Sequence, residues 1–309
     1  MLQVGSASPS RMGVLCALLA AFYAWSHVDM FMSNLTSVRS IPRFGNELQD
    51  TIFGIPDPVY VVFGNRGYKI MLANLLCNMA LFPAMHEHLL LAVSDEGTAD
   101  YLETFTENAT VIAIDLGGMD ETSDFNGFAY RELMYLRGLG LVEILKITAV
   151  QGKTVVWIEP DMHYRQSLLT TPGLSNLHNS LVSLQWDWDG FCGCLIRFPP
   201  FNASLSLYQE IMNRMSPPSV MFVSKHDQAL LNDVVYDLDI PIQTLDPCLY
   251  RSGTYLTRGY ADDRRTNCSG ITPVIQHFNW VVGRDTKIKM AKDDGGWYLS
   301  EDESACLIG

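Results

Sequence analysis

The sequence has no excess of basic residues. It contains 21 Lys and Arg against 34 Asp and Glu, which gives a formal net charge of −13 over 309 residues. A surface that binds nucleic acid normally carries clustered positive charge, so this balance argues against a nucleic-acid partner. An anionic small molecule can still bind, provided that a metal ion or a local Arg or Lys supplies the opposite charge.

The sequence also lacks the glycine fingerprint of dinucleotide-binding proteins. The nearest match, GLGL at residues 138–141, has no third glycine and interrupts a predicted helix instead of following a strand. This absence argues against a nicotinamide-dependent oxidoreductase. There is no internal repeat or low-complexity tract, and 48% hydrophobic with 18% charged residues indicates a globular chain with a sizeable core.

A long uninterrupted hydrophobic run is missing as well. The most apolar segment, residues 12–25, has 14 residues, fewer than the roughly 20 that span a bilayer, and its extension to Met32 includes His27 and Asp29. We expect a signal anchor over residues 12–32, because no small-x-small cleavage site follows the apolar run. A cleavable signal peptide is the alternative. Arg11 favours a cytosolic tail over residues 1–11 and a lumenal body.

The cysteines and glycosylation sequons agree with a lumenal body. Apart from Cys16 in the apolar segment, six cysteines remain, an even number that is compatible with disulfides in an oxidising compartment. Cys192-Gly193-Cys194 admits a zinc interpretation together with Cys248 and Cys268, but zinc pairs more often have two to four intervening residues. Disulfides are therefore favoured, with their connectivity open. Asn-x-Ser/Thr sequons occur at Asn34, Asn108, Asn202 and Asn267.

After a polar stem (residues 33–55), the body alternates apolar runs with helical patterns. We expect strands at 58–63, 89–94, 110–115, 154–159, 194–198 and 241–245, and helices at 65–80, 130–149, 203–215 and 226–236. This alternation predicts an α/β fold with a mixed, mostly parallel sheet flanked by helices. The sequence is accordingly divided into one domain over residues 56–300 and a C-terminal tail over 301–309.

Polar side chains follow four of the predicted strands. In open parallel α/β sheets, ligands bind at the carboxyl ends of the strands, so these positions are candidates for a binding site. They are Asn65, Arg66, Ser94, Asp95, Asp115, Glu159 and Asp161.

Glu159 and Asp161 are two positions apart in an extended segment, so their side chains point the same way. Two carboxylates held close repel each other unless a proton or a cation lies between them. Mg²⁺ or Mn²⁺ suits such oxygen ligands, and a bound ion of this kind stabilises a departing diphosphate as a Lewis acid. The alternative is a solvated acidic turn.

Several segments, taken in order, carry a resemblance to a known family: NRGYKIMLANLLCNM, YRELMYLRGLGLVEIL, GKTVVWIEPD, GFCGCLIR, HDQALLNDVV and PVIQHFNWVVGRDTKI. Residues 56–300 resemble the nucleotide-diphospho-sugar transferase family. Its members are glycosyltransferases of the Rossmann-type GT-A fold and include plant rhamnogalacturonan xylosyltransferases and extensin arabinosyltransferases.

The resemblance implies a metal site. The family's Asp-x-Asp motif falls on Glu159-x-Asp161, so the first position departs from the usual pattern and Asp161 is the expected direct ligand. His277 occupies the place of the histidine that completes the coordination in similar enzymes. An imidazole can bind a borderline ion such as Mn²⁺, and the alternative is a hydrogen-bonded core histidine.

The resemblance also implies contacts with the donor. Asp227 and Gln228 are expected near the reacting carbon of the donor sugar, although Asp227 could simply start a helix. Lys287 is expected at the diphosphate, with a solvated surface lysine as the alternative.

The nucleotide is expected beside Asn65 and Arg66, which follow the first strand. Asp95 and Asp115 are expected to contact base or ribose, or else to cap turns. Arg131 and Arg137 are six apart on a helix and so do not share a face, and Arg137 is preferred for the site.

Taken together, the sequence predicts a metal-dependent glycosyltransferase that uses Mn²⁺ or Mg²⁺. It would move a pentose or hexose from a nucleoside-diphosphate sugar, expected to be UDP-linked, to a glycan or glycoprotein hydroxyl with retention. The expected location is the Golgi membrane, as a single-pass type II protein with a lumenal domain, or alternatively secretion. The alternative function is a lumenal sugar- or glycoprotein-binding pseudoenzyme of the same fold.

Overall fold

The computed structural model describes residues 46–114, 128–172, 174–175, 180–216, 225–262 and 264–307. The predicted cytosolic tail, the anchor, Cys16, Asn34 and Asp115 lie outside these ranges. Residues 42–309 make up one compact unit. Within the described ranges, no helix is both long enough and apolar enough to cross a membrane.

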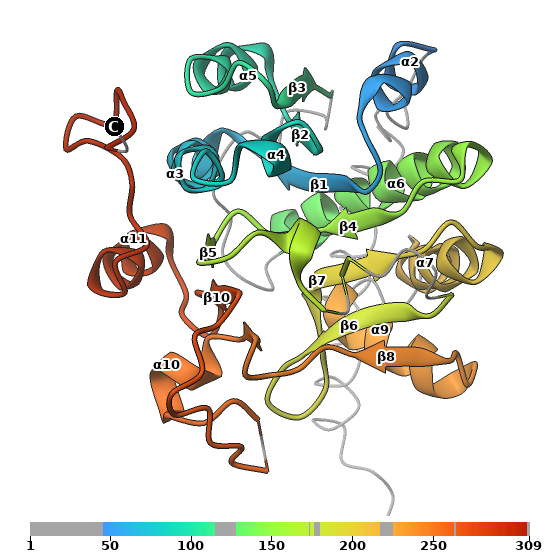
Figure 1. Cartoon of the computed structure of the whole chain (residues 1–309). Coiled ribbons are helices and arrows are strands. Elements are labelled where there is room, and N and C mark those ends of the chain that lie inside the picture. The colour runs from blue at the N-terminus through green and yellow to red at the C-terminus, as the bar shows by residue number, and fades with distance from the viewer. Residues whose placement is uncertain are drawn as a thin grey trace, which may run out of the picture. The chain divides into compact units, whose positions relative to one another are not determined.

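A seven-stranded mixed sheet forms the centre of this unit (Figure 1). Its order is β3-β2-β1-β4-β7-β6-β8, and its strands are β1 (Val59–Gly64), β2 (Leu89–Val93), β3 (Thr110–Ala113), β4 (Val155–Trp157), β6 (Val182–Trp186), β7 (Phe191–Phe198) and β8 (Ile242–Thr244). The pairs β1–β2, β2–β3, β1–β4 and β6–β8 are parallel, whereas β7 runs antiparallel to both of its neighbours. The predicted α/β fold with a mostly parallel sheet is confirmed.

The strand order reverses between β1 and β4. From β1 the chain moves outward to β2 and β3, and it then returns to place β4 on the other side of β1. In sheets of this kind the crevice at such a reversal, outside the carboxyl ends of the strands, is where ligands bind. Asn65 directly follows β1, and Glu159 lies two residues after the end of β4.

The helices fall into two groups that pack among themselves. One contains α3 (Lys69–Met79), α4 (Pro83–His86) and α5 (Glu96–Glu103); the other contains α2 (Asn46–Gly54), α6 (Phe128–Gln151), α7 (Asn202–Met215) and α9 (Asp227–Asp237). Two short 3₁₀ turns, η1 (Arg66–Tyr68) and η2 (Leu168–Thr170), complete this part. Helix α2 lies within the predicted polar stem. Its Leu48 and Ile52 are buried, so they belong to the core.

Two glycines allow close packing around the sheet. A Cβ on Gly64, at the end of β1, would lie 2.4 Å from Cδ1 of Leu72, so glycine lets α3 approach the strand closely. All residues from Ile70 to Met79 in α3 are buried. Within the GLGL stretch, a Cβ on Gly138 would lie 2.4 Å from Sδ of Met212. That stretch therefore serves the contact between α6 and α7.

A smaller sheet lies with α11 (Arg284–Asp293) on the side where β1 and β4 end (Figure 1). It consists of β5 (Met162–Tyr164), β10 (Ile275–His277) and β9 (Tyr250–Arg251) in the order β5-β10-β9. In the chain, β9 is followed by the short helix α10 (Thr254–Arg258). β5 and β10 are antiparallel, with His277 opposite Met162. This register brings His277 beside Asp161.

The six cysteines of the described residues form three disulfides: Cys77–Cys306, Cys192–Cys194 and Cys248–Cys268. The predicted disulfides are present, with the connectivity now defined. Cys306 also forms a β-bridge with Leu299, and the Tyr101 hydroxyl donates to the Glu303 carbonyl at 2.9 Å. The C-terminal tail is thus docked onto α3 and α5.

Candidate functional site

Three side chains from distant parts of the chain meet at the end of β4. Asp161 directly precedes β5, His277 ends β10, and Lys287 lies in the first half of α11. The Nε2 atom of His277 lies 3.0 Å from Oδ1 of Asp161, and the Lys287 ammonium donates to Oδ2 at 2.6 Å. The Asp161 backbone carbonyl also accepts from the Phe278 amide at 3.0 Å. Two of the three predicted metal ligands, Asp161 and His277, are therefore brought together with Lys287.

Asp161 and His277 in this cluster are buried, Lys287 is half-buried, and the charges of Asp161 and Lys287 shift each other's pKa. Asp161 and His277 have exposures of only 4% and 3%. Burial alone would raise the pKa of Asp161, but the charge of Lys287 and the hydrogen bonds from His277 and Lys287 outweigh it and hold that pKa well below its usual range. In the same way burial would lower the pKa of Lys287, and the Asp161 carboxylate raises it instead. The site therefore holds a carboxylate and an ammonium in their charged forms.

A second ionic cluster lies beside the first. The Arg137 guanidinium of α6 is 2.9 Å from Oε1 of Glu159 and 3.3 Å from Oδ2 of Asp227, the first residue of α9. The indole N–H of Trp157 donates to Oε1 of Glu159 at 3.2 Å, and the guanidinium lies 4.7 Å above the centre of the Trp157 rings. Glu159 is thus held by Arg137 and Trp157.

Charge and burial oppose each other in this cluster. Burial raises the pKa of Glu159, and the opposing charge of Arg137 only partly offsets it. For Arg137, burial would lower the pKa, but Glu159 and Asp227 together raise it above the usual value. The two acidic residues of the Glu159-x-Asp161 motif therefore differ: Asp161 is stabilised in its charged form, whereas the charged form of Glu159 is disfavoured by its surroundings.

Asn65, Arg66 and Asp95 follow strands β1 and β2. Asn65 is buried after β1 and precedes η1, whereas Arg66 is exposed. Asp95 caps α5: it accepts from the Thr98 amide at 2.8 Å and from the Thr98 hydroxyl at 2.7 Å. These bonds outweigh the effect of burial and lower the pKa of Asp95. The structure thus gives Asp95 the capping role that the sequence left open.

Gln228 follows Asp227 and faces β7. Its Oε1 atom lies 3.6 Å from Sγ of Cys192, and its backbone carbonyl accepts from the Asn232 side chain at 2.9 Å. The start of α9 at Asp227 agrees with the helix that the sequence predicts at 226–236.

Two tyrosines that were not among the predicted site residues, Tyr68 and Tyr130, lie near these charges. Tyr68 is coupled electrostatically to Lys287 and Asp161, and Tyr130 to Asp227 and Arg137. Burial raises the pKa of both phenols, so they remain hydroxyls that can donate hydrogen bonds. One signal was available, because Tyr130 precedes Arg137 by seven residues, which is nearly two helical turns and hence the same helix face.

The residues present fit a divalent ion. An oxygen donor and a nitrogen donor converge where Nε2 of His277 lies 3.0 Å from Oδ1 of Asp161. A mixed oxygen and nitrogen donor set suits Mn²⁺. The ammonium of Lys287 donates to the other carboxylate oxygen of Asp161 and neutralises its charge. A bound cation would neutralise part of that charge in its place.

The sequence matches no protein-family model and no curated protein. Among solved structures, it is similar to a glycosyltransferase involved in the glycosylation of the major capsid of PBCV-1, with 10% identity, a TM-score of 0.44, and coverage of 76% of this chain and 99% of that chain. It is also similar to the WbbM bifunctional glycosyltransferase (15% identity, TM-score 0.47, 74% of this chain and 46% of that chain). Mouse xyloside xylosyltransferase 1 is a third such structure (13% identity, TM-score 0.47, 73% of this chain and 98% of that chain). At these values the chemistry of the chain has to be argued from its own residues.

Proposed function

We propose that the protein is a glycosyltransferase that moves a sugar from a nucleoside-diphosphate donor to a hydroxyl group of a glycan or glycoprotein. The observation that carries this proposal is the buried Asp161–His277–Lys287 cluster at the end of β4. It lies at the reversal of strand order, where a parallel sheet offers a ligand crevice. A buried charge cluster in such a position is an expected place for a functional site.

In this proposal each cluster has its own role. Asp161 and His277 hold a divalent ion, proposed to be Mn²⁺, which when bound stabilises the negative charge of the leaving diphosphate. With the ion neutralising Asp161, the Lys287 ammonium would be available to contact the diphosphate as a second positive charge. Asn65 and Arg66, at the end of the neighbouring strand β1, receive the nucleotide, proposed to be uridine.

The second cluster positions the sugar. Arg137 fixes the Asp227 carboxylate at 3.3 Å, so Asp227 and Gln228 present oriented polar groups at the start of α9. We assign them contacts with the donor sugar near its reacting carbon. Retention of the anomeric configuration is part of the proposal, and the acceptor hydroxyl would approach on the same side.

A second candidate function is favoured by one observation. Because Glu159 is engaged by Arg137 and Trp157, the acidic motif offers fewer free ligand atoms than two unpaired carboxylates would. A protein that binds sugars or glycoproteins without transferring them would not need two free carboxylates for a metal ion.

A donor-turnover assay separates the two. Purified protein is incubated with Mn²⁺ and a panel of UDP-sugars, and released UDP is measured. We expect release with at least one donor, its loss in Asp161→Ala, and its retention in Asp293→Ala, whose carboxylate is 64% exposed on α11. The absence of both turnover and UDP binding in the unaltered protein would contradict the transferase. Sugar binding that depends on neither Mn²⁺ nor UDP would support the second candidate.

We also propose a lumenal domain in the Golgi, anchored through residues 12–32. Three disulfides support an oxidising compartment, and the sequon residues Asn108, Asn202 and Asn267 are all exposed and accessible to glycosylation. Endoglycosidase treatment of the protein expressed from secretory-pathway membranes should increase its electrophoretic mobility. An unchanged mobility would contradict the lumenal location.

A further inference from the structure

We propose that Cys192, Cys194 and His277 form a second metal site when the Cys192–Cys194 disulfide is reduced, and that this site takes a thiophilic divalent ion such as Zn²⁺. The site itself does not depend on the proposed transferase function. It shares one residue, His277, with the cluster at Asp161.

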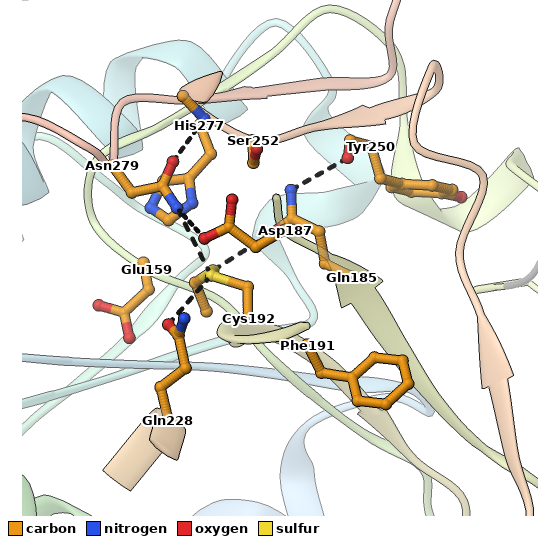
Figure 2. The surroundings of a disulfide bond; sticks show 12 residues. Glu159, Gln185, Asp187, Phe191, Cys192, Gln228, Tyr250, Ser252, His277 and Asn279 are labelled. Carbon is orange, nitrogen blue, oxygen red and sulfur yellow. Dashed lines mark hydrogen bonds between the residues drawn. A yellow bond between two sulfur atoms is a disulfide. The ribbon is translucent and has the colours of Figure 1, made fainter. Parts of the chain in front are cut away.

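The three ligands already lie together. Cys192 and Cys194 are two positions apart on β7, so their side chains leave the same face of the strand. One ring nitrogen of His277 and both sulfur atoms lie within 4.8 Å of one another, in the part of the chain that the structure describes. Figure 2 shows the imidazole next to the disulfide. All three residues are buried, with exposures of 1%, 4% and 3%.

The imidazole is oriented for this role. Its Nε2 atom faces the Asp161 carboxylate at 3.0 Å, while Nδ1 has no hydrogen-bond partner within the described ranges. A metal-binding histidine commonly donates its second ring N–H to a carboxylate, which fixes the tautomer and directs the other nitrogen at the metal. Asp161 can serve as that carboxylate for an ion held by the two sulfurs.

One neighbouring side chain, that of Asn279, directs an N–H group at Cys192. The side-chain amide nitrogen of Asn279 lies 3.6 Å from Sγ of Cys192 and 3.3 Å from the Asp187 carboxylate (Figure 2). Asn279 is held in turn by the Gly253 amide, which donates to its side-chain oxygen. An N–H group directed at a thiolate stabilises the charged form.

The redox step balances with a dithiol as the reductant. The S–S bond breaks, the dithiol gives up two electrons and two protons as it closes to its own disulfide, and Cys192 and Cys194 become thiols. Metal binding then releases the two thiol protons. Two thiolates and one imidazole select zinc over the oxygen-preferring ions and leave its fourth position open.

The shared histidine makes the two sites exclusive. A neutral imidazole has only one nitrogen with a free lone pair, so His277 cannot bind an ion beside Asp161 and another at the sulfurs at the same time. Under the proposed function, zinc at the reduced pair would therefore weaken Mn²⁺ binding at Asp161.

Cobalt titration tests the site directly. The protein is produced in a reducing cytosol and purified with dithiothreitol, because both sulfurs are buried and reduction of the folded, oxidised protein would be slow. Circular dichroism confirms that it is folded. Co²⁺ should then give the thiolate-to-cobalt charge-transfer absorption, saturating at one ion per chain and displaced by Zn²⁺.

The matched controls isolate the three ligands. The absorption should be missing in the double variant Cys192→Ser/Cys194→Ser, which keeps the other four cysteines. It should also be missing in the oxidised protein. His277→Ala should bind Co²⁺ at least tenfold more weakly. The same absorption in the double variant would overturn the proposal, and so would the absence of this absorption in folded, reduced protein that is otherwise unaltered. Mn²⁺-dependent UDP binding by the oxidised protein is a separate measurement, so failure of the transferase proposal would be recognised independently.

Discussion

Asp161 and His277 are 116 positions apart in the sequence, yet Nε2 of the histidine lies 3.0 Å from Oδ1 of the aspartate. The antiparallel pairing of β5 with β10 creates this contact, because His277 is in register with Met162, the neighbour of Asp161. Lys287 closes the other side of the carboxylate from α11. A short three-stranded sheet thus converts three distant sequence positions into one buried charge cluster at the end of β4.

Removing the Lys287 charge should strongly destabilise the protein. Lys287→Met leaves Asp161 buried and without its ammonium partner, and loss of one member of a buried ion pair costs about 3–5 kcal/mol. Lys289→Met is the matched control, because Lys289 is 75% exposed on the same helix, and its effect should stay within about 0.5 kcal/mol. Urea unfolding measures both. Mn²⁺ should restore part of the stability of Lys287→Met, and equal losses in the two variants would contradict the account.

Stability should depend on pH through Asp161. Because its pKa is lowered in the folded state, its contribution is complete above the unfolded pKa of about 3.9 and is lost as the pH falls below that value. The free energy of unfolding should therefore decrease as the pH falls below about 4. Asp161→Asn should flatten this slope, whereas Asp293→Asn on the surface should leave it unchanged. An unaltered slope in Asp161→Asn would show that other carboxylates dominate.

Arg137 should be required for the second cluster. Arg137→Met leaves Glu159 and Asp227 without their shared cation, and we expect a loss of about 3–5 kcal/mol. Adding Glu159→Gln should recover part of this loss, because the charged form of Glu159 is already disfavoured by burial. Lys146→Met, at a 48% exposed position on the same helix, serves as the control in thermal and urea unfolding. No recovery in the double variant would argue against the pairing.

The disulfide between Cys77 and Cys306 should stabilise the protein more than the one between Cys192 and Cys194. The former spans 229 positions and the latter only 2, and the loss of unfolded-chain entropy grows with loop length. Cys77→Ser/Cys306→Ser should cost about 2–5 kcal/mol and make the docked tail sensitive to proteases. Limited proteolysis with mass spectrometry detects this, and a tail that stays resistant in the variant would contradict the prediction.

Much of the sheet could be predicted because its strands are buried apolar runs. The strand predicted at 58–63 appears as Val59–Gly64 and the one at 89–94 as Leu89–Val93. Helix α11 was missed because its sequence, RDTKIKMAKD, is almost entirely polar and only Ala291 is buried. Strands β5 and β10 have three residues each, too few to show a period.

The site was predictable in part. The Asp161–His277 pair could be expected from resemblance alone, since no local pattern links positions so far apart. The pairing of Glu159 with Arg137 could not, because it depends on how far α6 is rotated against β4, which packing of side chains such as Trp157 decides. The contact between Lys287 and Asp161 likewise required the position of α11.

Calorimetric titration of UDP into the oxidised protein, with Mn²⁺ and with a chelator, shows whether Asp161 and His277 hold an ion that binds the diphosphate. We expect binding that requires Mn²⁺, is weakened at least tenfold in Asp161→Ala and in His277→Ala, and is unchanged in Asp293→Ala. UDP binding that is equally strong with the chelator, or equally strong in the two site variants, would contradict this expectation.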